Sequence, residues 1–469
     1  MPSEFQSLLF DPADPKAALT QLPQASAVFA LYGAESHFEP YVGRTPNLRG
    51  RLERLLQPSA KHPRRLQLAG RVRRIAWRLT GSEFESLLVQ FELLHHIYGP
   101  KSLERMHLRH PAFVRFLGGN PYPRVSVTYR PSQREADWAY GPFPSRAAAE
   151  RYVDEALKLF LLRRCTDDLD PNPSHPGCVY SEMKMCLAPC YQGCTDERYA
   201  QEAAAVASFL ATRGESRLAM LRAQRDEASA NLEFETASAI HAQVARMESV
   251  RALAPELVRP LNQLRAVILQ ASANPGEVAI FLFENARLRG PAAFSTLGMR
   301  IQNEQSGSSS LFAHPVAMEL MPEEAGIWGL GSEPGKGETE VLEALYQGAT
   351  SVVPQPPQAE GGASAPDGPS ARLKTPARSL LEARLEAALA ALAALAEPSG
   401  PPSAALRQGH LALLKRWYYR PEARRTGEIF FPAGGGRWPI KAILRGIGRI
   451  AAGAIKNMPS DPRTPPEAS

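Results

Sequence analysis

The chain has 469 residues, 44 % of them hydrophobic, which is enough for two to four domains with buried cores. Its net charge of +6 is by itself weak evidence for a polyanionic partner. We find neither an apolar run of about 18 residues nor an N-terminal signal region, so we expect no membrane partner, no secreted disulfide scaffold and a cytoplasmic location.

An irregular lead-in and then a β-hairpin are predicted at the start of the chain. Residues 1–24 are rich in Pro and Ala, and we expect no regular structure there. Apolar runs over 27–32 and 41–44 are separated by a turn-rich stretch, which predicts two paired strands.

Two helices and a third strand are predicted next. A helix over 48–56 puts its leucines on one face, and Asn47 is a candidate cap for it. A strand is predicted over 71–79. The segment 82–97 predicts a second helix, because Ser82 and the acids after it are typical of a helix N-terminus.

This part of the chain is strongly basic. From Arg44 to Arg78 there are eleven Lys or Arg residues and one acid, Glu53. Such a surface attracts a phosphate backbone, although a solvated basic face is the alternative. The candidate DNA-binding residues are Arg49, Arg54, Arg64, Arg65, Arg71, Arg73 and Arg74.

Four of the five cysteines fall within 26 residues: Cys165, Cys178, Cys186 and Cys190. Thiolates in fours are the ligands that zinc and iron–sulfur clusters take, so a metal or cluster site is the first interpretation. Chance clustering of buried cysteines and a disulfide framework are the weaker alternatives. Cys194 follows as a spare thiol.

The rest of the chain predicts helices, two strands and a flexible segment. Residues 220–247 predict either a helical hairpin or one long helix, and 264–270 and 277–283 predict strands. A Pro/Gly/Ala/Ser-rich stretch over 354–378 predicts a disordered linker. A helix follows over 379–397, with Ser379 as a plausible cap.

The helix end over 410–420 is basic and aromatic. Trp417, Tyr418 and Tyr419 could stack on bases as part of a second nucleic-acid contact, and the basic trend continues through Lys441 and Arg445. The alternative is that these aromatics pack back on the core.

Several motifs resemble the UvrC family, the incision subunit of bacterial nucleotide excision repair, and its short homologue Cho. They are YVGRTPNLRGRL at 41–52, YPRV at 122–125, YGPFP at 140–144, MCLAPC at 185–190 and LEFETASAI at 232–240. The resemblance covers about residues 20–250.

The resemblance implies an α+β multidomain protein. It would contain a small GIY-YIG mixed sheet with helices, a Cys-rich cluster region, a UVR helical hairpin and a poorly assigned α/β tail. The expected segments are 1–24 lead-in, 25–105 GIY-YIG nuclease-like domain, 106–164 connecting β/α region, 165–200 Cys-rich region, 201–252 UVR-type hairpin, 253–353 β-containing region and possible RNase H-like remnant, 354–378 linker, 379–456 helical basic tail and 457–469 disordered end.

The resemblance also assigns the nuclease positions, and two of them are replaced. Tyr41, Arg44 and Arg51 match the second tyrosine, the following basic residue and the phosphate-binding arginine. Phe29 stands where the first tyrosine is expected and Gln90 where the metal-binding glutamate is expected. A phenyl ring cannot activate water and an amide is a weak Mg²⁺ ligand, so we expect a degenerate nuclease domain.

Two neighbours could be considered as substitutes, and neither is well placed. Tyr32 is an odd number of residues from Phe29 and should face the other side of the strand. Glu92 is about 200° round the helix from Gln90. Mg²⁺ or Mn²⁺ is therefore expected only if the site is active.

The remaining implied ligands and partners follow from the middle and UVR segments. The four cysteines Cys165, Cys178, Cys186 and Cys190 match the family's ligands for a [4Fe–4S] cluster, with Zn²⁺ as the alternative. The implied partners are DNA and a UvrB-like protein, the latter through Phe234, Glu235, Ala237 and Ile240. His241 and Ala242 replace the motif's Arg-Asp pair.

Overall fold

The computed structural model describes residues 5–35, 38–56, 68–131, 138–166, 168–297, 299, 376–395 and 403–456. Arg64 and Arg65, most of the 354–378 linker and the 457–469 end therefore lie outside the described residues. No helix within the described part is long and apolar enough to cross a membrane.

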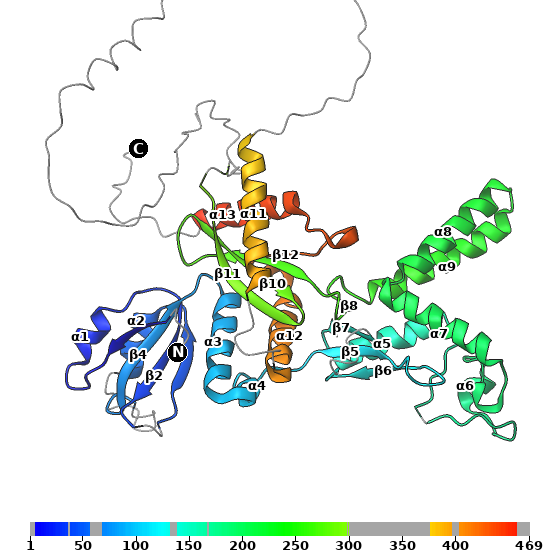
Figure 1. The fold of residues 1–469 in the computed structure, drawn as a ribbon, viewed down its shortest axis with the longest axis horizontal. Coiled ribbons are helices and arrows are strands. Elements are labelled where there is room, and N and C mark those ends of the chain that lie inside the picture. The colour runs from blue at the N-terminus through cyan, green and yellow to red at the C-terminus, as the bar shows by residue number, and fades with distance from the viewer. Residues whose placement is uncertain are drawn as a thin grey trace, which may run out of the picture. The chain divides into compact units, whose positions relative to one another are not determined.

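The N-terminal domain is built on an antiparallel sheet with strand order β1-β4-β2-β3 (Figure 1). The strands are β1 (Gln6–Leu9), β2 (Ala27–Gly33), β3 (Tyr41–Thr45) and β4 (Val72–Leu79). The helices are α1 (Pro15–Thr20), α2 (Leu48–Leu56) and α3 (Glu83–Tyr98). The predicted hairpin, third strand and two helices are confirmed. The expectation of an irregular lead-in was wrong, because β1 pairs with β4 and α1 contributes buried residues to the core shared with α2.

Helix α3 is buried on two sides. Val89 and Leu93 pack on the N-terminal sheet, against Val28 and Ala30. Phe84, Leu87, Leu88 and Phe91 belong to a different core, which they share with a third sheet and α12 (Ala404–Tyr418). This two-sided burial explains why α3 is apolar around most of its circumference.

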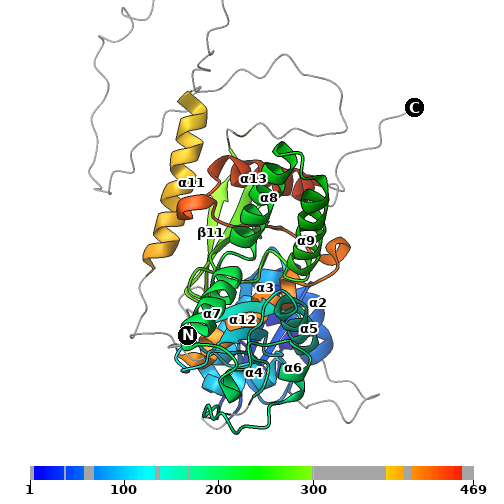
Figure 2. The same ribbon diagram turned by 90° about the vertical axis from the view of Figure 1, so that its right-hand side faces the viewer.

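The middle of the chain forms a second antiparallel sheet, with order β6-β5-β7-β8, and a set of helices. Its strands are β5 (Ala112–Phe116), β6 (Val125–Thr128), β7 (Ala139–Phe143) and β8 (Arg259–Pro260). The helices here are α4 (Ser102–Arg105), α5 (Arg146–Leu157), α6 (Val179–Glu182), α7 (Asp196–Ala211), α8 (Glu215–Ala230) and α9 (Phe234–Ala252). Helices α8 and α9 lie side by side as a hairpin (Figure 2). Of the two predictions for residues 220–247, the helical hairpin is therefore confirmed and the single long helix is not.

The third sheet joins two distant parts of the chain. Its order is β11-β10-β9-β12, and all its pairings are antiparallel. The strands are β9 (Ala266–Ala271), β10 (Glu277–Glu284), β11 (Arg287–Ser295) and β12 (Glu428–Phe430). Because β12 pairs with β9, the β-containing region and the tail share one sheet instead of forming separate segments.

Helices cover both faces of this sheet. Helices α11 (Pro376–Ala394) and α13 (Ile440–Lys456) pack on one face, and α12 and α3 pack on the other. Helix α11 begins at Pro376, so the prediction of Ser379 as its cap was wrong.

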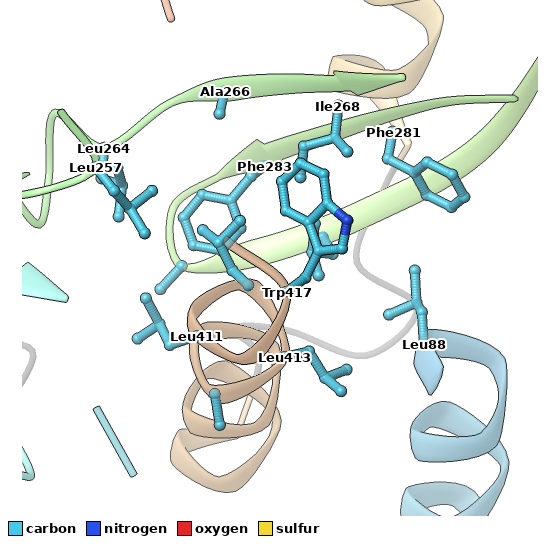
Figure 3. Packing of buried hydrophobic residues seen from close by; sticks show 14 of the residues in the cluster. Leu88, Leu257, Leu264, Ala266, Ile268, Phe281, Phe283, Leu411, Leu413 and Trp417 are labelled. Atoms are coloured by element: carbon cyan, nitrogen blue, oxygen red, sulfur yellow. The ribbon is translucent and has the colours of Figure 1, made fainter. Parts of the chain in front are cut away.

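The aromatic end of α12 lies in the core. Figure 3 shows Trp417 among Ile268, Phe281 and Phe283 of the third sheet. The Trp417 indole Nε1 donates to the Thr426 carbonyl (2.9 Å). The Tyr419 hydroxyl likewise donates to the Pro142 carbonyl (2.7 Å). Of the two sequence interpretations for Trp417 and Tyr419, core packing is the one the fold supports.

Candidate functional site

The nuclease-like positions begin with Phe29 and Tyr41, which lie on neighbouring strands of the N-terminal sheet. Their ring centroids are 6.1 Å apart. The Phe29 side chain is buried, at 1 % exposure, and its ring closes over Gly43, where an added Cβ would lie 2.7 Å from the ring. The position therefore offers a packed hydrocarbon ring and no hydroxyl.

Tyr32 faces the opposite side of the sheet from Phe29, as its spacing predicts. It packs with Val28 and Ala30 in the core that contains the inner side of α3. The Arg74 guanidinium stacks over its ring at 4.4 Å from the centroid. Burial raises the pKa of the Tyr32 hydroxyl, with Arg74 opposing that shift. Tyr32 is thus separated by the sheet from the position of the missing tyrosine.

Gln90 is half-buried on α3, and two carboxylates of the same helix are engaged elsewhere. A Glu85 carboxylate oxygen accepts the Gly81 backbone N–H at 2.8 Å. The Glu92 carboxylate lies 4.0 Å from Nε2 of the buried His410.

The third carboxylate of α3, that of Glu83, binds two arginines. Arg44 lies 3.2 Å away, and Arg420 donates to both carboxylate oxygens at 2.7 and 2.8 Å. Hydrogen bonding to Arg420, with further help from Arg44, lowers the pKa of Glu83 to about 2. Arg44, the basic residue that follows the second tyrosine in the motif, therefore already shares the Glu83 carboxylate with Arg420.

A preformed metal site is absent from the part of the chain that the structure describes. No three His, Cys, Asp or Glu side chains in that part are arranged to hold a metal ion. Because Glu83, Glu85 and Glu92 all have other contacts, no carboxylate of α3 compensates for Gln90.

The predicted DNA-binding arginines differ in how exposed their side chains are. Arg54, Arg71 and Arg73 are exposed, as is Arg51 at the phosphate-binding position, although Arg54 and Arg73 also donate to the nearby carbonyls of Gly50 and Gly70. The guanidinium of Arg49 donates to the carbonyls of Leu22 (2.7 Å) and Thr20 (2.8 Å), at the C-terminal end of α1.

The cysteine region brings four thiols into mutual electrostatic contact. Burial, followed by repulsion from Cys178, Cys190 and Cys165, raises the pKa of Cys186. The pKa of Cys190 is raised in the same way, by burial and then by Cys178 and Cys165. All five cysteines are free thiols.

Cys194 stands apart from this group. Its pKa is raised by burial and then by Asp196, with Arg198 opposing the shift.

Donors surround the four sulfurs. The Ala188 and Tyr191 backbone N–H groups donate to the sulfurs of Cys186 and Cys190. The Arg163 Nη1 lies 3.7 Å from the Cys165 sulfur, and Arg163 is almost fully buried. N–H donors and a nearby cation stabilise thiolates, which are the form that binds metal.

The tip of the α8–α9 hairpin exposes apolar side chains. Leu232 is 72 % exposed and Phe234 is 65 % exposed, whereas the base of the hairpin packs in the middle core. Leu232 also has a left-handed backbone, with φ of 63°. Of the other predicted partner residues, Glu235 is exposed and Ala237 and Ile240 are half-buried.

Sequence reasoning missed Arg420 and the role of Arg163. Arg420 is 337 residues from Glu83, and no local pattern signals that pairing. Arg163 could have been found, because a basic residue two positions before a predicted thiolate ligand is a candidate counter-charge.

Comparison with known proteins identifies the middle of the chain. Residues 113–209, from β5 through most of α7, match the family described as UvrC/Cho excinuclease, middle domain. No solved structure matches the chain.

Curated relatives match over a longer stretch. UvrABC system protein C of Alcanivorax borkumensis is 29 % identical over 238 residues, which are 51 % of this chain and 39 % of that protein. The same protein of Ruminiclostridium cellulolyticum is 27 % identical over 300 residues, which are 63 % of this chain and 48 % of the relative. The matched part thus spans less than half the length of these relatives. Over more than half of its own length, the chain is similar to UvrC proteins.

Proposed function

We propose that this chain is a nucleotide excision repair factor that binds DNA and a UvrB-type partner but does not cut DNA with its N-terminal domain. The observation that carries the proposal is the buried Phe29 ring packed on Gly43, at the place of the expected catalytic tyrosine. Gln90, with no compensating carboxylate on α3, supports the same conclusion.

DNA binding is supported by the basic surface of the N-terminal domain. Arg51, Arg54, Arg71 and Arg73 are exposed, and cations in such a setting attract a phosphate backbone without reading sequence. Arg49 and Arg74 are weaker candidates, because their side chains are only partly exposed.

Partner binding is supported by the hairpin tip. An amphipathic helix pair with an exposed Leu232 and Phe234 has apolar surface left to cover, and a similar helix pair on a partner could cover it. Glu235 next to Phe234 would add polar contacts at the edge of such an interface. In this proposal the partner is a UvrB-type protein.

For the cysteine site we propose an iron–sulfur cluster in preference to zinc. Four thiolates on one Zn²⁺ would lie about 3.8 Å from one another, given a Zn–S distance of about 2.3 Å. A [4Fe–4S] cluster is larger, and the four cysteines match the positions of the UvrC family's cluster ligands, so we propose the cluster in preference to Zn²⁺.

Cys165, Cys178, Cys186 and Cys190 would be the ligands of a [4Fe–4S] cluster, with Cys194 outside the set. A bound cluster would supply a rigid joint and a one-electron redox centre. An anaerobically purified sample with zinc by elemental analysis and no visible iron–sulfur absorbance would contradict the assignment.

The second candidate function is an active, Cho-like structure-specific endonuclease that makes one metal-dependent incision. It is favoured by the survival of Tyr41, Arg44 and Arg51 at three of the nuclease positions. It would require Mg²⁺ or Mn²⁺ and a carboxylate other than those of α3.

An incision assay separates the two functions. A labelled bubble or nicked duplex is incubated with the chain and Mg²⁺ or Mn²⁺, and Arg51→Ala is the matched control. We expect no cleavage above background in either sample. Robust metal-dependent cleavage that disappears in Arg51→Ala would establish the endonuclease instead.

A further inference from the structure

Helix α13 presents two very different faces. Its apolar face is buried on the third sheet, and Ile443 and Ile447 are both fully covered. Gly446 allows the close approach, because an added Cβ would lie 2.7 Å from the Phe430 ring. The opposite face is therefore the only one that a partner can reach.

That outer face carries a row of cations. Between residues 429 and 456 there are five Lys or Arg residues and no acid. Lys441 and Arg445 on α13, together with Arg437 in the segment just before the helix, are all exposed and recur every four residues in the sequence; they are here called the α13 stripe. Arg449 continues the row but donates to both oxygens of Glu428, at 2.7 and 2.5 Å, so we leave it out of the stripe.

The spacing of the stripe suits a polyanion with closely repeated charges. Four residues rise about 6 Å along an α-helix, so Lys441 and Arg445 lie about 6 Å apart along α13, and Arg437 lies in the extended segment just before the helix. One strand of a duplex presents a phosphate about every 3.4 Å along the axis, so the two helical cations alone could face about two phosphates.

We propose that the α13 stripe is a second phosphate-contacting surface, which binds the backbone of duplex DNA independently of the N-terminal basic face. A basic amphipathic helix on its own could equally bind an anionic membrane surface. Here Ile443 and Ile447 are held in the core and cannot insert among acyl chains, so only the charged face is available. Because the outer face of α13 offers positive charge but no apolar side chains that could insert into a membrane, nucleic acid is the better candidate ligand.

This inference goes beyond the proposed function by assigning a DNA contact to the C-terminal part of the chain. It shares with that function only the premise that the chain binds DNA. The two surfaces can be tested separately, since the stripe belongs to α13 and the segment before it, whereas the N-terminal arginines belong to the domain built on the first sheet.

The test is the salt dependence of binding to a fluorescent duplex, measured by anisotropy with the full chain. Each lost phosphate contact lowers the slope of log K against log salt by about 0.9. The triple variant Arg437→Gln, Lys441→Gln, Arg445→Gln should therefore lower the slope by about 2 to 3. Lys441→Arg with Arg445→Lys should keep it.

A matched control changes the net charge equally on another helix. Arg146→Gln and Arg151→Gln on α5, with Lys158→Gln directly after it, remove three positive charges, two of which are ion-paired there. This control should leave the slope within error. Circular dichroism of all variants checks that the exposed substitutions leave the fold intact.

The outcomes separate the two claims. A slope that is unchanged in the stripe variant, while N-terminal variants at Arg54, Arg71 and Arg73 weaken binding, overturns the inference alone. A slope that falls in the stripe variant while those N-terminal variants bind normally supports the stripe and contradicts the N-terminal surface. Stripe-dependent binding to anionic phospholipid vesicles, without binding to the duplex, would also overturn the inference.

Discussion

Arg420 and Glu83 form a two-pronged ion pair, with Nη1 to Oε2 at 2.7 Å and Nη2 to Oε1 at 2.8 Å. The pair links the residues just after α12 to the first turn of α3. Arg44 shares the same carboxylate at 3.2 Å. A residue from the C-terminal part of the chain, Arg420, thereby binds the Glu83 carboxylate of the nuclease-like domain.

Removing either partner should weaken this joint modestly. A double-mutant cycle of Arg420→Gln and Glu83→Gln should give a coupling energy of at most about 1 kcal/mol, because partly exposed pairs are screened by solvent. High salt should reduce the coupling further. Urea unfolding checks it, with Arg222→Gln and Glu248→Gln on the hairpin as the control pair.

The same pair should be sensitive to acid. The folded pKa of Glu83 is about 2, below its ordinary value of 4.5, so its contribution to stability is present above pH 4.5 and is lost as the pH falls towards 2. Glu83→Gln should lose that dependence. An identical acid profile for wild type and Glu83→Gln would contradict the pairing.

His410 should make the chain sensitive to mild acid. Its Nδ1 accepts the Leu288 N–H at 3.1 Å, and burial, with added repulsion from Arg287 and His95, lowers its pKa from 6.5 to about 3. Glu92, 4.0 Å from Nε2, is the acid that faces the ring. The unfolded chain therefore binds a proton between pH 6.5 and 3 that the folded chain does not, so stability falls as the pH falls.

The expected slope is up to about 1.4 kcal/mol per pH unit for that single proton. His410→Gln keeps an acceptor for the Leu288 N–H and cannot titrate, so it should flatten the slope by about one proton. Urea midpoints across this pH range give the measurement. If His410→Gln keeps the wild-type slope of stability against pH, a group other than His410 binds the proton.

Leu232 combines a strained backbone with an exposed side chain at the hairpin tip. Replacing it with glycine should leave stability unchanged or raise it by up to about 1 kcal/mol, because glycine adopts φ of 63° without steric cost. The same change should weaken binding to a UvrB-type partner. Leu232→Ala is the control, since it removes the side chain but keeps the strained backbone. If the wild type, Leu232→Gly and Leu232→Ala bind the partner equally well, Leu232 is not part of the interface.

Arg163 should matter to the metal content of the cysteine region. Arg163→Met removes the buried cation 3.7 Å from the Cys165 sulfur, so a group bound by four thiolates would lose a neutralising charge. We expect at least a two-fold lower iron and sulfide content per chain and a lower reduction potential in what remains. Arg163→Lys keeps a positive charge, so its iron and sulfide content and its reduction potential should lie closer to those of the wild type. If Arg163→Met has the wild-type iron and sulfide content and the wild-type reduction potential, Arg163 does not stabilise the bound group.

Local features of the fold were predictable from the sequence, and long-range ones were not. Helix α2 was correctly bounded because its signals are adjacent: the Asn47 side chain accepts the Gly50 N–H at 2.9 Å. The pairing of β12 with β9 was missed because β12 is a three-residue strand more than 150 residues away along the chain. Ser379 was chosen as a cap from its residue type, but the helix had already begun.

The candidate site shows the same division. Motif spacing pointed to Phe29, Gln90 and the four cysteines, because each is defined by its place in a short pattern. Spacing could not tell that Arg420 would bind Glu83 or that Arg49 would donate to α1 carbonyls. Those contacts depend on how separate elements pack.

The most direct test of a non-cutting repair factor is a single reaction that contains the chain, a UvrB-type protein, Mg²⁺ and a labelled bubble duplex, analysed on both native and denaturing gels. The account predicts a ternary complex on the native gel that Phe234→Ala with Glu235→Ala abolishes, and intact strands on the denaturing gel. Strands cut by wild type but not by Arg51→Ala, or a ternary complex that survives the hairpin variant, would contradict it.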